Sequence, residues 1–156
     1  MKKIALIVLI FVAAVAAKAQ DYNTGIGIRL GPFSGVTLKH FLGEGKAVEG
    51  ILNTRYHGFS IHGLIEFEKP LGDVSGLSWY FGFGGHIGFY DRYNFPDHYA
   101  YHEDIVTIGA DGILGIEYTF EEIPLNLSID WKPQIDLIGY GEFWGDGFAL
   151  SARYIF

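Results

Sequence analysis

Apolar and polar residues alternate along most of the chain after residue 20. No stretch of this part holds the apolar period of about 3.6 residues that an amphipathic helix needs, whereas a period of two recurs throughout. We expect a β-strand from each segment that alternates in this way. These segments are Tyr22–Leu30, Gly35–Leu42, Lys46–Tyr56, Gly58–Glu68, Leu77–Tyr90, Ile105–Phe120, Ile123–Pro133 and Gly147–Phe156.

Short connectors rich in glycine, proline and acidic residues separate the predicted strands. Examples are residues 43–45 (GEG) and 70–73 (PLGD), which favour tight turns between antiparallel neighbours. Pro124 and Pro133 bracket the seventh segment, where a fully paired sheet tolerates proline. Most segments also reach the length of about 9–11 residues that a tilted strand needs to cross a bilayer. The pattern predicts an all-β, eight-stranded antiparallel up-and-down barrel.

The N-terminal residues have the pattern of an export signal. Lys2 and Lys3 precede an apolar run of 14 residues from Ile4 to Ala17, which is too short for a spanning helix of about 20 residues. Residues 17–19 (AKA) supply a small-x-small cleavage pattern. We expect residues 1–19 to be a cleaved signal peptide rather than a retained anchor, and residues 20–156 to form the barrel.

Charge and cysteine content exclude several function classes. The whole chain has 11 basic and 18 acidic residues, a formal charge of −7. Loss of the three lysines in the predicted signal would make this 8 − 18 = −10. Such an acidic chain has no basic stripe for phosphates, so we expect no nucleic-acid partner. The absence of cysteine excludes disulfides, thiol catalysis and Cys-ligated zinc.

The two faces of the predicted strands differ in three ways. The polar face carries five basic and six acidic side chains, a near-balanced set of the kind that an enclosed space requires, because buried charges must be paired. Glycines recur on this face, where they would leave room in a narrow barrel for long Arg and Glu neighbours. Aromatic residues gather near the strand ends on the apolar face, as in an interfacial girdle. We therefore expect an apolar, lipid-facing exterior and a polar, plugged interior.

The charged residues of the polar face define a predicted network of ion pairs inside the barrel. Its members are Arg29, Lys39, Glu49, Arg55, Glu66, Glu68, Asp111, Glu117, Asp130, Lys132 and Arg153.

The last strand carries the most specific family pattern. Phe148, Leu150, Tyr154 and Phe156 alternate up to a C-terminal aromatic residue. The mature chain resembles the small porin-like eight-stranded outer-membrane barrels of Gram-negative bacteria, of the OmpX/OmpA-transmembrane-domain type. The resemblance implies location in the outer membrane of the cell envelope, contact with its lipid, and recognition of the last strand by the outer-membrane assembly machinery. It does not imply transport, because side chains fill so narrow a barrel.

The longest predicted exterior loop is the richest in reactive side chains. It spans residues 91–104, and His98 and His102 lie in it four residues apart, beside acidic residues. Such a set makes a weak metal candidate, against the simpler interpretation of a solvated loop. Its tyrosines also suit contact with an extracellular partner.

A hydrolase is the main alternative to a protein without catalysis. Ser60 and His62 share the inward face with Glu66 and Glu68, but hydrolysis of lipid would need a nucleophile that opens toward lipid. No phosphate loop, dinucleotide fingerprint or metal motif is present, so we expect no cofactor. The sequence favours an integral outer-membrane protein with a structural or surface-interaction role and no catalysis. A lipid-modifying hydrolase and a soluble secreted ligand-binding barrel stay as alternatives.

Overall fold

A computed structural model describes residues 23–55, 58–90, 105–139 and 141–156. The predicted signal peptide and the loop 91–104, with His98 and His102, lie outside the described residues. The described part is built from strands, and it contains no helix long and apolar enough to cross a membrane. The strands are β1 Thr24–Leu30, β2 Ser34–Gly43, β3 Lys46–Arg55, β4 Gly58–Pro70, β5 Leu77–Tyr90, β6 Ile105–Thr119, β7 Leu125–Trp131, β8 Gln134–Ile138, β9 Phe143–Trp144 and β10 Phe148–Ile155.

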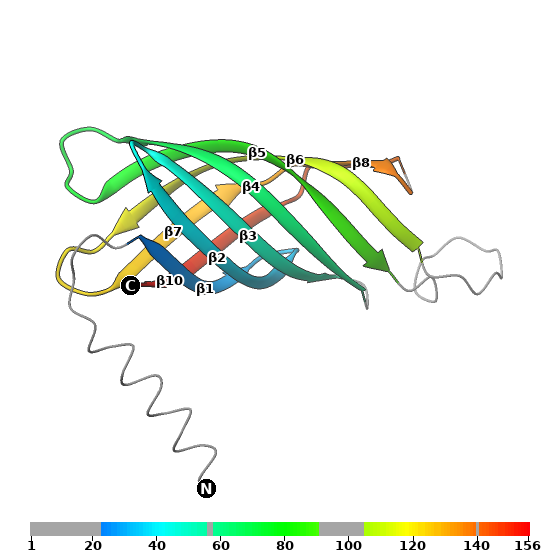
Figure 1. Cartoon of the computed structure of the whole chain (residues 1–156), viewed down its shortest axis with the longest axis horizontal. Helices are drawn as coiled ribbons and strands as arrows, with labels where there is room; N and C mark the ends of the chain where they lie inside the picture. The colour runs from blue at the N-terminus through cyan, green and yellow to red at the C-terminus, as the bar shows by residue number, and fades with distance from the viewer. Residues whose placement is uncertain (1–22, 56–57, 91–104, 140) are drawn as a thin grey trace, which may run out of the picture.

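The strands form a closed antiparallel barrel (Figure 1). β1 to β6 pair in chain order, and β1 also pairs with β10, where Gly25 lies opposite Ile155. β10 pairs with β7, and β7 pairs with β6, so the sheet has no free edge along the barrel wall. β7 and β8 together make one of the eight barrel strands. The prediction of an eight-stranded up-and-down barrel is confirmed.

The seventh barrel strand is longer than the sequence pattern predicted. Beyond Trp131, β8 continues the pairing with β6, with Gln134 opposite Asp111. The ladder passes through Pro133, whose carbonyl oxygen accepts a 2.9 Å hydrogen bond from the Gly112 N–H. The predicted end of the strand at Pro133 is therefore wrong. The same boundary predicts a second long exterior loop over residues 137–146, and this prediction is also wrong in part, because residues 137–138 belong to β8 and residues 143–144 form β9. β9 folds back on β8 and pairs with it through Trp144 and Gln134.

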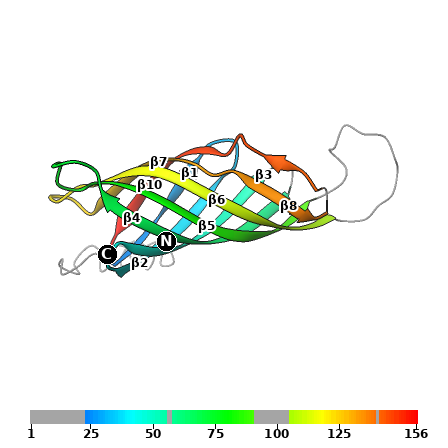
Figure 2. The ribbon, with the colours of Figure 1, turned by 90° about the horizontal axis from the view of Figure 1, so that it is seen from above.

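The two ends of the barrel differ in their connections. The turns after β2, β4 and β6 lie at the end that carries the C-terminus, here the terminal end (Figure 1). The β2–β3 turn is tight, with positive φ at Gly43 (85°), Glu44 (53°) and Gly45 (70°). The strands β1, β3 and β5 end at the opposite end of the barrel, where β8 and β9 project beyond β10 (Figure 2).

Side chains alternate between an apolar exterior and a largely polar interior. Exterior residues such as Ile28, Phe83 and Leu150 are more than half exposed. Twenty polar or charged residues are buried within the described part. The predicted assignment of the two faces is confirmed, with one addition that the pattern did not single out. Four residues form an apolar cluster inside the barrel: Ile51, Leu64, Tyr80 and Ile113.

Glycines of the inner face make room for large neighbours, as expected, although several of these neighbours are rings. A Cβ atom on Gly115 would lie 2.5 Å from the Tyr80 ring, and one on Gly109 would lie 2.4 Å from the His86 ring. Gly82 leaves space beside Glu66 in the expected way, because a Cβ atom there would lie 3.0 Å from the Glu66 Cγ atom. The inner-face glycines therefore leave space in the narrow interior for both aromatic and charged side chains.

Candidate functional site: the charged barrel interior

Two clusters of charged side chains fill the interior. The first lies toward the terminal end and contains three glutamates and two cations. The Lys39 Nζ atom is 2.9 Å from a carboxylate oxygen of Glu66 and 2.8 Å from one of Glu117. Arg153 pairs with Glu49 at 2.5 Å, and the Thr37 hydroxyl donates to the same carboxylate. These partners come from β2, β3, β4, β6 and β10, so they tie strands together across the barrel.

Further hydrogen bonds hold the two arginines in the interior. Arg153 also donates to Asn126 Oδ1 at 3.1 Å and to Ser128 Oγ at 2.8 Å. Arg29 binds both carboxylate oxygens of Asp130, and the Tyr80 hydroxyl donates to the same carboxylate at 3.1 Å. A buried charge is tolerated when it is paired and its remaining hydrogen-bonding atoms are satisfied. These contacts pair the charge of each guanidinium, whereas the Nε atoms of Arg29 and Arg153 are buried without a hydrogen-bond partner among the described residues.

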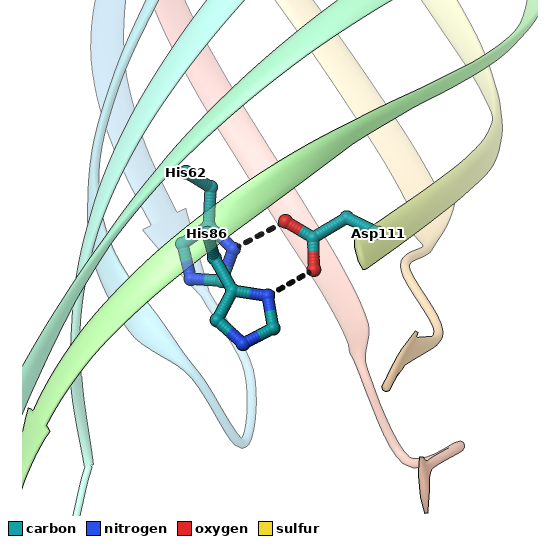
Figure 3. Close-up of side chains that lie close together, drawn as sticks. All are labelled: His62, His86 and Asp111. Carbon is teal, nitrogen blue, oxygen red and sulfur yellow. Dashed lines mark hydrogen bonds and ion pairs between the residues drawn. The ribbon is translucent and has the colours of Figure 1, made fainter. Parts of the chain in front are cut away.

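The second cluster lies nearer the opposite end and is built around two histidines. Asp111 Oδ2 is 2.7 Å from His62 Nδ1, and Asp111 Oδ1 is 2.8 Å from His86 Nδ1 (Figure 3). His86 Nε2 is 2.8 Å from Asp136 Oδ1, while His62 Nε2 is 2.8 Å from Ser60 Oγ. Both rings are therefore held at both nitrogen atoms.

Strand register places these groups together. His62 on β4 lies directly opposite His86 on β5, and their ring centroids are 5.1 Å apart. On β6, Gly109 lies opposite His86, and its missing side chain leaves space for the ring. Asp111 follows two residues later on the same inward face. Asp136 on β8 lies opposite Gly109 and so reaches the far side of His86.

Lys132 is the cation of this second cluster. Its Nζ atom is 3.2 Å from His62 Nδ1 and 3.9 Å from Asp111 Oδ1, and it donates to Gln134 Oε1 at 2.9 Å. Asp136 accepts a 3.1 Å hydrogen bond from Trp144 Nε1 through its second oxygen. The cluster thus holds two carboxylates, one ammonium group and two imidazoles, all inside the barrel.

Most of the charged residues that the sequence predicted to line the interior are buried there. These are Arg29, Lys39, Glu49, Glu66, Asp111, Glu117, Asp130, Lys132 and Arg153. Glu68 is half-buried, near Glu117 and Ser78, and the side chain of Arg55 lies outside the described residues.

The outward row of the last strand is also where the sequence predicted it. Phe148, Leu150 and Phe156 are exposed on the outer face, and the Tyr154 ring stacks on Phe156 with 6.2 Å between ring centroids.

Asp136 is the carboxylate of the second cluster that sequence reasoning missed. The predicted strand end at Pro133 leaves Asp136 outside the barrel wall, so the alternation was not applied to it. The alternation nevertheless continues past the proline, with Lys132, Gln134 and Asp136 polar and Ile135 and Leu137 apolar. This continued alternation is the signal that could have found Asp136.

Ser60, His62 and Asp111 are joined by the hydrogen bonds of a serine hydrolase triad. Ser60 Oγ contacts His62 Nε2, and His62 Nδ1 contacts Asp111, as a nucleophile, base and orienting acid do. The acid is Asp111, not Glu66 or Glu68. A working nucleophile also needs space for a reacting carbonyl about 3 Å away. Ser60 is 2% exposed and points into the interior, so the triad hydrogen bonds occur without an accessible nucleophile.

Comparison with known proteins addresses the fold. No protein-family model and no curated protein matches the chain. Among solved structures, the chain is similar to the N-terminal β-barrel domain of OprF from Pseudomonas aeruginosa, with a TM-score of 0.68 and 17% sequence identity over 87% of this chain and 98% of that one. The chain has the fold of that barrel domain.

Proposed function

We propose that this chain is an integral outer-membrane barrel protein with a structural or surface-interaction role and no catalysis. The observation that carries the proposal is the distribution of side chains: exposed apolar residues cover the barrel wall, and paired charges fill the interior. The OprF-like fold and the resemblance to small outer-membrane barrels support the same location. An export signal at residues 1–19 would deliver the chain to a Gram-negative cell envelope.

The arrangement argues against a soluble ligand-binding barrel. Large apolar side chains such as Ile129 (55% exposed) on β7 and Phe83 (61% exposed) on β5 stand on the outer face of the barrel. A soluble monomer rarely exposes a continuous apolar surface of more than a few hundred Å². Hydrocarbon would cover this surface without cost, and closure of the barrel pairs the backbone groups that lipid cannot satisfy.

Aromatic side chains mark both margins of the apolar wall. Toward the terminal end, Trp79 stacks on Phe81 and Tyr118 packs edge-on against Phe120. Toward the opposite end, Phe59 stacks on Phe89 with 5.0 Å between ring centroids. Amphipathic rings favour the two membrane–water interfaces, so these pairs support the proposed placement of the barrel across a bilayer.

Fractionation of cells that express the full chain tests the location. We expect the protein in the outer-membrane fraction after alkaline carbonate extraction, and a shift in its gel mobility between unheated and boiled samples. Release into the soluble fraction by carbonate would overturn the proposal in favour of a secreted soluble barrel.

A charged residue on the lipid-facing wall should be costly. Leu114 lies near the middle of β6 and is 49% exposed on the outer face. We expect Leu114→Arg to reduce folding stability in lipid vesicles by about 2–4 kcal/mol, because arginine is costly near the bilayer midplane. Urea titration of refolded protein measures this change.

Ile123→Arg is the matched control for this prediction. Ile123 is similarly exposed (46%), but it lies in the β6–β7 turn at the terminal end. We expect a cost of about 0–1 kcal/mol there, as near an interface. Equal effects of the two substitutions would contradict a lipid-facing wall at Leu114.

Two partners belong to the proposal. The assembly machinery would recognise the last strand during biogenesis, and an extracellular partner would contact the loop 91–104. The tyrosine-rich composition of that loop supports the second suggestion. Deletion of residues 92–103, followed by a test of cell-surface binding with the barrel still folded, would decide whether the loop carries the interaction.

A lipid-modifying hydrolase is the second candidate, because Ser60, His62 and Asp111 have the triad hydrogen bonds. Purified protein should be assayed on phospholipid and lipopolysaccharide, with Ser60→Ala as the control. Acyl release by the wild type that Ser60→Ala abolishes would establish the hydrolase. We expect no release above the level of the variant, because Ser60 is buried.

A further inference from the structure

We propose that His62, His86 and Asp111 form a binding site for a divalent first-row transition-metal ion of the Zn²⁺ type inside the barrel. The inference does not depend on where in the cell the barrel resides. His/carboxylate sets bind such ions through imidazole nitrogen and carboxylate oxygen. All three residues are buried, and they come from three adjacent strands, β4, β5 and β6.

The ligand atoms already converge. One potential ligand atom from each residue lies within 4.8 Å of the others. Both imidazoles turn their Nδ1 atoms toward the same carboxylate, at 2.7 and 2.8 Å (Figure 3). A tetrahedral ion with bonds of about 2.0–2.2 Å sets its ligand atoms about 3.3–3.6 Å apart. Small side-chain shifts would therefore suffice for all three ligands to bind, and water would take the fourth position.

The groups behind the histidines fit a metal site equally well. A metal-binding histidine commonly donates its other ring N–H to a carboxylate, carbonyl or water, which fixes the ring. Here His86 Nε2 contacts Asp136, which is itself held by Trp144 Nε1. His62 Nε2 contacts Ser60 Oγ. In this interpretation Ser60 orients the metal ligand His62, and this role explains why a buried serine makes the same contact to a histidine as in a hydrolase triad.

The charges around the proposed site favour a bound cation overall, but one nearby positive charge limits its affinity. Asp111 and Asp136 bring two negative charges, and Lys132 brings one positive charge 3.2 Å from His62 Nδ1. The ammonium group repels an incoming metal ion and competes for the same carboxylate. Removal of this charge should therefore tighten metal binding, whereas in a purely structural network it would bring no such gain.

The test uses a variant that keeps only the two histidines of the site. The chain has six histidines, so His40→Gln, His57→Gln, His98→Gln and His102→Gln leave His62 and His86. This variant, refolded in detergent and checked by heat-modifiable mobility, is titrated with Zn²⁺ by calorimetry and with Co²⁺ by visible absorption. We expect one equivalent bound with a Kd of about 1 µM or tighter and the intense visible bands of tetrahedral Co²⁺. No binding in this folded variant would overturn the proposal.

Further substitutions in the same background assign the roles. His86→Gln, His62→Gln and Asp111→Asn should each weaken binding by about 100-fold or more, because each removes a ligand. Asp136→Asn and Ser60→Ala should weaken binding by about 10–100-fold, because the native side chains only orient the two histidine ligands. Lys132→Met should tighten it by about 10-fold, by loss of charge repulsion. Binding that is unchanged in folded His86→Gln and His62→Gln would place the metal elsewhere and overturn the proposal.

If a ligand variant fails to fold, the histidine-reduced protein still decides the question. Imidazole ¹⁵N resonances of His62 and His86 report metal coordination without any substitution in the site. A change at both rings on addition of one equivalent of Zn²⁺ supports the site. Unchanged resonances overturn it.

Discussion

Lys39→Met is expected to destabilise the folded barrel by about 3–5 kcal/mol, because it leaves buried carboxylates without their counter-ion. The Lys39 ammonium group lies 2.9 Å from Glu66 and 2.8 Å from Glu117, and all three side chains are at most 1% exposed. Arg153, which pairs with Glu49, would then be the remaining cation for three glutamates. Urea unfolding of the purified protein in detergent micelles or lipid vesicles measures the loss.

Two comparisons show whether the loss of stability comes from the buried ion pairs of Lys39 or would follow the removal of any lysine. Lys69→Met removes an exposed cation near the end of β4, and exposed charges contribute about 0–1 kcal/mol. Glu66→Gln combined with Lys39→Met should recover part of the lost stability, because one unpaired charge disappears. A loss of less than about 1 kcal/mol for Lys39→Met would contradict a closed, ion-paired interior.

Phe156→Ala is expected to lower the amount of protein in the outer membrane strongly while folding in vitro stays nearly normal. The backbone of Phe156 closes the barrel, with hydrogen bonds of 2.8 and 3.1 Å to Thr24. Alanine keeps these bonds and removes an exposed ring that stacks on Tyr154. The loss of buried apolar area should cost about 1–3 kcal/mol. The resemblance to small outer-membrane barrels leads us to propose that the assembly machinery recognises the same ring.

Two measurements on Phe156→Ala separate a loss of folding stability from a loss of recognition during assembly. These are the refolding yield into vesicles and the amount of the protein in cellular outer membranes. Phe148→Ala is the matched control, because Phe148 has the same outward position at the other end of β10. It should leave cellular levels close to those of the wild type. Wild-type levels of Phe156→Ala in cells would show that the C-terminal resemblance is accidental.

The alternation in the sequence was sufficient to predict the barrel and the assignment of its faces. A period of two places every second residue on the same face, so Arg29 and Arg153 could be assigned to the interior without coordinates. The same rule extends to β8, where Asp136 keeps the inward phase. The error at Pro133 arose because proline was treated as the end of a paired strand, whereas its carbonyl group still accepts a ladder hydrogen bond.

Specific pairs inside the barrel could not be predicted in this way. Arg29 and Asp130 are 101 residues apart and meet because of barrel closure and strand stagger. His62 and His86 meet because the β4–β5 hairpin has one particular register. A shift of that register by one residue would turn one histidine outward. The candidate metal site therefore depends on the β4–β5 register, which the alternation of apolar and polar residues does not specify.

Site-directed labelling of two neighbouring residues tests the central claim, a barrel with its apolar wall in lipid and a closed polar interior. The chain has no cysteine, so Leu150→Cys and Ser151→Cys each introduce a single thiol. Leu150 is 59% exposed on the outer face, and Ser151 is 4% exposed inside. After refolding into vesicles, a spin label at position 150 should be relaxed by membrane-dissolved oxygen and protected from a water-soluble nickel complex, while the thiol at 151 should resist labelling. Strong relaxation of the label at 150 by the nickel complex, or rapid labelling at 151, would contradict the account.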